Sequence, residues 1–147
     1  AAANSYQVVT LVGVNLTACW MHSPSTWLIG DANGALWYTN NTGASWHQIT
    51  AFTGSGTGSI SAIAFATQSV GYMAQTISSR GWLMRPLDGG ATWARIPDGG
   101  SIVDFTDNDQ INRLAIADSA PENVRANILF AGGLAADATD GVFFKGA

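Results

Sequence analysis

The residues most suited to binding a metal form one acidic segment. Asp104, Asp107 and Asp109 fall within six residues, and their hard oxygen ligands would suit Ca²⁺. The segment has neither the glycine nor the distal glutamate of an EF-hand loop, so a solvated connection between structural units is the simpler interpretation. His22 and His47 have no cysteine or further histidine at ligand spacing. We therefore expect no metal site, with this segment as the weak candidate for Ca²⁺.

Residues for acid–base or nucleophilic catalysis are scarce. Glu122 is the only glutamate, whereas a glycosidase needs two carboxyl groups that face each other across a cleft. Most aspartates stand in turn-like segments, and no such pair is recognisable. Cys19 is the only cysteine and lies in the apolar run 16–20, where a buried small side chain is a simpler interpretation than a reactive thiol. The sequence predicts neither an enzyme nor a cofactor.

The aromatic residues give the best indication of binding. The chain has 6 Trp and 3 Tyr in 147 residues. Flat sugar faces stack on exposed indole rings while arginine binds sugar hydroxyl groups, so the candidate glycan site combines Trp37 or Trp82 with Arg80 or Arg85. The alternative is that these rings fill a core or a subunit interface, where Trp and Tyr are also favoured.

Short apolar runs separated by turn residues predict the strands that position these side chains. We expect three antiparallel four-stranded units, at about 13–50, 58–97 and 110–147, in a single all-β domain. The expected strands are 16–20, 27–30, 35–38, 46–49, 60–65, 70–74, 81–85, 93–96, 111–116, 127–131 and 142–144. The third unit lacks its fourth strand, which the apolar run 6–12 could supply within the chain or between chains.

One short pattern occurs twice, each time after the third strand of a unit. Residues 39–46 read Thr-Asn-Asn-Thr-Gly-Ala-Ser-Trp, and residues 86–93 read Pro-Leu-Asp-Gly-Gly-Ala-Thr-Trp, 47 residues further on. A fixed period of this length, with several strands in it, is typical of a repeat architecture. The pattern resembles the Asp-box, or BNR repeat, of sialidases, sortilin-like receptors and photosystem II assembly-factor-like proteins. The resemblance implies β-propeller blades, each with this turn between its third and fourth strands.

The box residues are expected to be structural. Glycine supplies a positive φ, the Asn or Asp side chain accepts backbone N–H groups, Ser or Thr bonds back across the turn, and tryptophan wedges between blades. These positions are Asn41, Gly43, Ser45 and Trp46 in the first box, and Asp88, Gly90, Thr92 and Trp93 in the second. The boxes depart from the family pattern at Asn41, which replaces aspartate, and at Pro86.

The same resemblance implies a non-catalytic member of the family. A sialidase site needs an arginine triad, a tyrosine nucleophile with a glutamate partner and an acid/base aspartate, which this chain cannot supply with one glutamate. Propellers have about four to eight blades, so three units are too few to close a ring. We expect closure by oligomerisation or by docking on a larger protein assembly; the alternative is that the three sheets pack as a compact barrel or sandwich. Small propeller lectins of bacteria and fungi build their rings from short chains by oligomerisation.

Composition narrows the partners. The net charge of −4 and five scattered arginines argue against nucleic acid, and no apolar run approaches the roughly 20 residues of a membrane helix. Only 11% of residues are charged, so other copies or another protein are expected to cover part of the surface.

Two functions stay open. One is a structural module that assembles with itself or decorates a capsid or tail, since Asp-box-like domains occur in phage virion proteins. The other is an oligomeric lectin. A virion surface or an extracellular location fits either.

Overall fold

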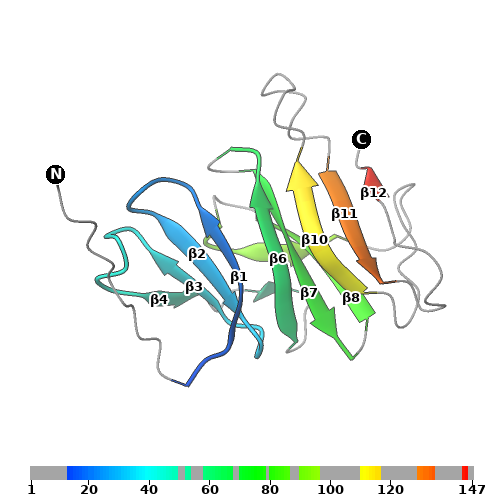
Figure 1. The fold of residues 1–147 in the computed structure, drawn as a ribbon, viewed down its shortest axis with the longest axis horizontal. Coiled ribbons are helices and arrows are strands. Elements are labelled where there is room, and N and C mark those ends of the chain that lie inside the picture. The colour runs from blue at the N-terminus through cyan, green and yellow to red at the C-terminus, as the bar shows by residue number, and fades with distance from the viewer. Residues whose placement is uncertain are drawn as a thin grey trace, which may run out of the picture.

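The computed structural model describes residues 13–49, 52–53, 58–67, 70–78, 80–86, 90–96, 110–116, 129–134 and 144–145. These residues form three β-sheets and no helix (Figure 1). The prediction of an all-β protein is confirmed.

The first sheet is an antiparallel meander with the strand order β1-β2-β3-β4. Its strands are β1 (Leu16–Met21), β2 (Trp27–Asp31), β3 (Leu36–Thr39) and β4 (His47–Ile49). Gly34 closes the hairpin between β2 and β3 with a φ of 86°, and its N–H donates to the carbonyl of Asp31 at 3.2 Å. Glycine adopts this backbone conformation without strain, as the Asp-Ala-Asn-Gly sequence predicts.

The second sheet has the order β5-β9-β8-β7-β6. Its strands are β5 (Phe52–Thr53), β6 (Ser59–Phe65), β7 (Gly71–Ile77), β8 (Arg80–Pro86) and β9 (Trp93–Arg95). Strands β6 to β9 repeat the meander of the first sheet. The two-residue strand β5 pairs in parallel with the outer side of β9, and the sequence analysis did not predict it.

The third sheet has the order β10-β11-β12, with β10 (Gln110–Ile116), β11 (Leu129–Leu134) and β12 (Phe144–Lys145). All three strands pair antiparallel and overlap the predicted ones. The run 6–12, which we expected to close this unit, lies outside the described residues. The structure therefore leaves closure of the third unit as a prediction.

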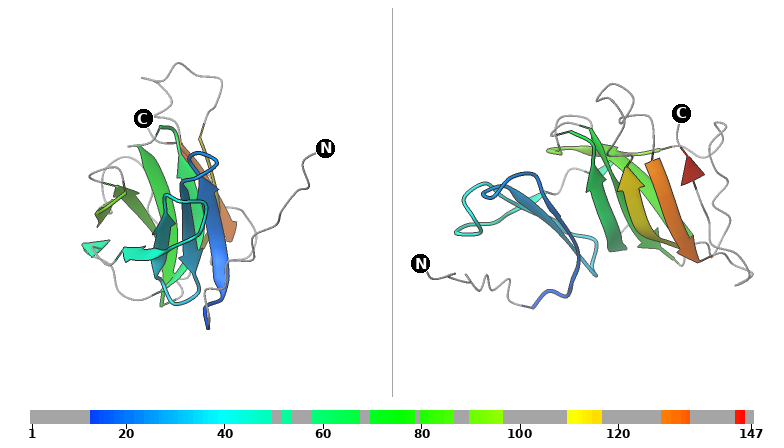
Figure 2. Two further views of the ribbon diagram at one scale, coloured as in Figure 1. Left: turned by 90° about the vertical axis from the view of Figure 1, so that its left-hand side faces the viewer. Right: turned by 45° about the horizontal axis from the view of Figure 1, so that its top comes forward.

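The three sheets follow one another across the molecule in chain order. Strands β1, β6 and β10, called the inner strands below, lie side by side, and the other strands of each sheet extend away from them (Figures 1 and 2). One core cluster fills the boundary between the first two sheets. Its buried members are Leu28, Leu36, Ile60, Ile63, Phe65, Met73, Met84 and Trp93.

A second core cluster fills the boundary between the second and third sheets. Its buried members are Ala74, Leu83 and Ile111. Each boundary is therefore a layer of apolar side chains from two sheets, and the second sheet is covered on both faces.

Candidate functional site

The first box is a turn held by its own side chains. The Oδ1 atom of Asn41 accepts the backbone N–H of Ser45 at 3.0 Å, and its Nδ2 atom donates to the Ser45 hydroxyl at 2.8 Å. The hydroxyl of Thr39 accepts the backbone N–H of Gly43 at 3.1 Å. Thr42 and Gly43 both have positive φ, 58° and 81°. Asn41 thus makes the backbone bond expected of it, although the family pattern has aspartate there.

The second box ends in a tryptophan with no exposed surface. The indole N–H of Trp93 donates to the carbonyl of Gly90 at 2.9 Å, and its ring meets Phe65 edge-on at 5.8 Å. Gly90 has a φ of 102°. Asp88 lies outside the described residues. Thr92 is half-buried.

One part of the candidate glycan site does form a cluster. The guanidinium of Arg80 lies 4.5 Å from the ring centre of Trp82, and that of Arg95 lies 3.0 Å from it. Both distances lie within the range of cation–π contacts. Trp82 and Arg80 were predicted from the sequence, whereas Arg95, which register places across from Met84 on the neighbouring strand, was not.

The other proposed glycan residues lie elsewhere. Trp37 is in the first sheet, half-buried, with its indole N–H bonded to the carboxylate of Asp31 at 3.0 Å. Arg85 is exposed, and its charge partly offsets the rise in the pKa of Tyr72 that burial causes. No hydrogen bond or ring contact joins Trp37 to Trp82 in the part of the chain that the structure describes.

A shallow hollow of about 180 Å³ opens between the first and second sheets at the ends of their inner strands. Trp20, Met21 and His22 line it from the first sheet, and Phe65 lines it from the second. The rings of His22 and Phe65 meet at 4.3 Å, and those of Trp20 and Phe65 at 6.2 Å. Partial burial lowers the pKa of His22 below its ordinary value of 6.5, because desolvation disfavours the charged imidazolium.

The first and second sheets differ in how far their equivalent faces are buried. We call the face that a sheet turns toward the preceding sheet its rear face and the opposite one its front face. Strand register identifies equivalent rear positions in the first two sheets. In the second sheet they are Ile60, Ile63, Phe65, Met73, Met84 and Trp93, all buried against the first sheet.

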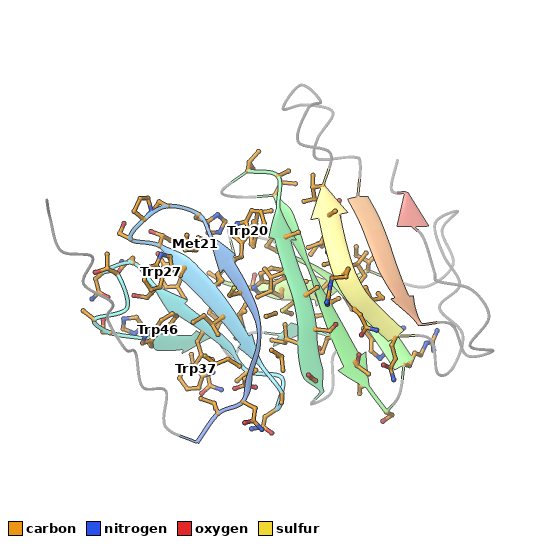
Figure 3. All side chains as sticks on the ribbon, viewed as in Figure 1. Trp20, Met21, Trp27, Trp37 and Trp46 are labelled. Carbon is orange, nitrogen blue, oxygen red and sulfur yellow. The ribbon has the colours of Figure 1, made fainter. Side chains whose placement is uncertain are left out.

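The equivalent rear positions of the first sheet are also apolar but are not covered in the same way. They are Leu16, Cys19, Met21, Ile29, Trp37 and Trp46. Leu16 is 49% exposed, Met21 is 65% exposed, and Cys19 is exposed as well. Trp27 and Trp46 pack together on this face, with ring centres 6.4 Å apart (Figure 3). We call this group the open rear face.

The expectation of a buried Cys19 is wrong, because no preceding sheet covers β1 in the described part of the chain. The sequence does contain a signal for this difference, because the three inner strands carry apolar residues at equivalent positions. Leu16, Ile60 and Ile111 occupy one position, and each precedes a residue at which the strand register shifts. The second and third of these side chains are buried, at 0% and 1% exposure, each against a preceding sheet.

The register shift recurs at the same place in all three inner strands. A β-bulge leaves Thr17, Ser61 and Asn112 unpaired in their ladders. The hydroxyl of Thr17 donates to the carbonyl of Ile60 in the next sheet, and the hydroxyl of Ser61 donates to the carbonyl of Ile111 in the sheet after that. The same kind of polar contact therefore occurs at each of the two boundaries inside the chain.

The described residues show neither a group of metal ligands nor a membrane-spanning helix. Among the described residues, no group of three or more His, Cys, Asp or Glu side chains is placed to hold a metal ion. Asp104, Asp107 and Asp109 lie outside those residues. Within the same part of the chain, no helix is long and apolar enough to cross a membrane.

No family model and no curated protein matches the sequence. The Asp-box resemblance therefore depends on the residues of the two boxes.

Proposed function

We propose that this protein is a non-catalytic structural and interaction module, built from Asp-box, blade-like units, that works by assembling through its sheet faces. Its partners are further copies of itself or a larger particle such as a capsid or tail, at a virion surface. No catalytic group is part of the proposal.

The observation that carries this proposal is the open rear face. Its side chains are of the same apolar types as those that fill the boundary between the first and second sheets. Contiguous exposed apolar patches are unusual on a soluble monomer and mark interaction surfaces. A sheet face of this composition that no described sheet covers therefore supports a protein that becomes complete on association.

The test measures mass in solution as a function of concentration, for the natural chain and for Leu16→Asp. We expect the natural chain to associate and the variant to be shifted toward the monomer, because a carboxylate cannot be buried there without a large desolvation penalty. Ala44→Asp adds the same charge at an exposed turn position and should leave association unchanged. Monomers of identical mass for the natural chain and Leu16→Asp at every concentration would contradict self-assembly and leave docking on a larger particle as the proposal.

A lectin is the second candidate function, and the hollow between the first two sheets favours it. Aromatic rings with a nearby imidazole are a suitable surface for a sugar, and the hollow lies between two units. The cluster of Trp82 is less suitable, because guanidinium groups already occupy its ring.

This second candidate is tested by titrating simple sugars while following tryptophan fluorescence. A saturable change that His22→Ala abolishes and Trp82→Phe retains would support a glycan site in the hollow. A chain that responds to none of the sugars would exclude the lectin and leave the assembling module as the proposal.

A further inference from the structure

We infer that copies of this chain associate head to tail, with the open rear face of one copy packed on the front face of the third sheet of another. The contact would use the same residue positions as the two boundaries inside the chain. This inference depends on the proposed assembling function and adds the partner, a second copy, and the register of the contact.

The first step is the position shared by Leu16, Ile60 and Ile111. Ile60 packs against Gly30 so closely that a Cβ on Gly30 would lie 2.4 Å from its side chain. Ile111 belongs to the same buried cluster as Ala74, the residue that register makes equivalent to Gly30. At both boundaries a branched apolar side chain thus packs on a sheet position with little or no side chain.

The chain carries one more residue at each of these two positions. Leu16 is an exposed apolar side chain of the first sheet. Gly132 is the third sheet's equivalent of Gly30, because it pairs with Arg113 as Gly30 pairs with Ala18. Leu16 of one copy would therefore lie over Gly132 of another.

The second step is the polar contact at the bulge. Thr17 and Ser61 each donate across a boundary to the carbonyl of the next sheet's apolar residue. The third bulge residue is Asn112, which is exposed and whose amide carries two hydrogens to donate. In the proposed contact it donates to the carbonyl of Leu16 in the second copy.

The third step is the end of the inner strands. Trp20 on the front of the first sheet meets Phe65 on the rear of the second. In the third sheet the equivalent of Trp20 is Ala115, which is exposed. In the first sheet the equivalent of Phe65 is Met21, which is also exposed. Arg113 is the one departure, since Ala18 and Ala62 hold that position elsewhere. Its aliphatic stem can cover apolar surface while the guanidinium reaches water, and arginine is common at interfaces.

A rear-to-rear dimer would not satisfy these positions. It would place Leu16 near Leu16 and provide neither the glycine position nor the bulge donor. A head-to-tail contact provides both, and it leads to a ring if its rotation closes and to a filament if it does not. In a two-chain ring, both open faces of both copies would be covered.

The experiment uses two single-cysteine variants in a Cys19→Ser background. One carries Met21→Cys on the open rear face, and the other carries Ala115→Cys on the front of the third sheet. Each is treated with a short bis-maleimide alone and after mixing, and the products are separated by denaturing electrophoresis. We expect cross-linked dimer in the mixture and little from either variant alone, since equivalent faces do not meet.

The controls separate this inference from the proposed function. Ala44→Cys mixed with Met21→Cys should give no dimer, which excludes random collision. Efficient cross-linking of Met21→Cys with itself would overturn the head-to-tail contact while leaving assembly intact. An associated chain that cross-links in no combination would do the same, whereas a chain that is also monomeric by mass would contradict both the head-to-tail contact and self-assembly. Near-ultraviolet circular dichroism of each variant verifies that it is folded.

Discussion

Trp93 and Trp46 end the same turn in two sheets, yet their surroundings differ. Trp93 is fully buried, and its indole N–H is bonded to the Gly90 carbonyl. Trp46 is half-buried beside Trp27, and its indole nitrogen has no hydrogen-bond partner among the described residues. The difference arises because the first sheet covers Trp93, while no described sheet precedes Trp46. Burial of a box tryptophan is therefore decided by the neighbouring sheet and not by the turn.

The largest expected effect tests this difference directly. Trp93→Ala should lower the free energy of unfolding by about 3–5 kcal/mol, as is typical for truncating a buried aromatic residue. Trp46→Ala should cost only about 1 kcal/mol, the scale of a single aromatic pair. Denaturant unfolding at a concentration where the chain is monomeric measures both. Equal losses would show that the turn alone sets the role of the tryptophan, and Trp93→Phe provides a milder variant if Trp93→Ala does not fold.

The next effect concerns the close packing of the first boundary. Gly30→Ala places a methyl group against Ile60 and should cost about 1–3 kcal/mol through overpacking. Combining it with Ile60→Ala removes part of the clash, so the two losses should not add. Strict additivity in a double-mutant cycle would contradict direct packing between these residues.

A smaller effect is expected at the bulge residues, where Thr17 lies at the boundary between the first two sheets and Asn112 lies on the exposed front face of the third sheet. Thr17→Val removes the donor to Ile60 and should cost about 1 kcal/mol of stability, while Thr17→Ser keeps the hydroxyl and most of the stability. Asn112→Ala should leave the unfolding free energy of the monomer nearly unchanged and weaken association instead. A loss of monomer stability at Asn112 equal to that at Thr17 would show that its side chain already has an internal role.

The smallest effect depends on pH at the same boundary. The pKa of His22 is lowered in the folded chain, so the unfolded chain binds more protons between the folded value and 6.5, and stability rises with pH there. We expect stability to fall as the pH decreases below about 6.5. The difference in unfolding free energy between the natural chain and His22→Gln isolates this contribution. A difference that does not change between pH 5 and 8 would contradict it.

The sequence predicted the strands well because alternating apolar runs and turn residues are local signals. It also predicted the bond that Asn41 accepts, since that contact closes within five residues. It missed β5, because a two-residue strand that pairs in parallel depends on the position of β9 and not on its own residues.

The candidate site was less predictable for a related reason. Whether Trp37 or Cys19 faces a neighbour or solvent depends on whether another sheet covers the rear face of the first sheet, and the periodicity of a strand does not show this. Arg95 was missed because its contact with Trp82 joins two adjacent strands, β8 and β9, and depends on their register. That register cannot be read from the periodicity of either strand alone.

The recurring bulge has a consequence for how such a chain could change in length. Because both boundaries use the same apolar position and the same bulge donor, a duplicated or deleted unit would meet its new neighbours through contacts that already exist. The number of units in one polypeptide can then vary without inventing new interface chemistry. A gene encoding a tandem duplication should give a longer array with the same joints.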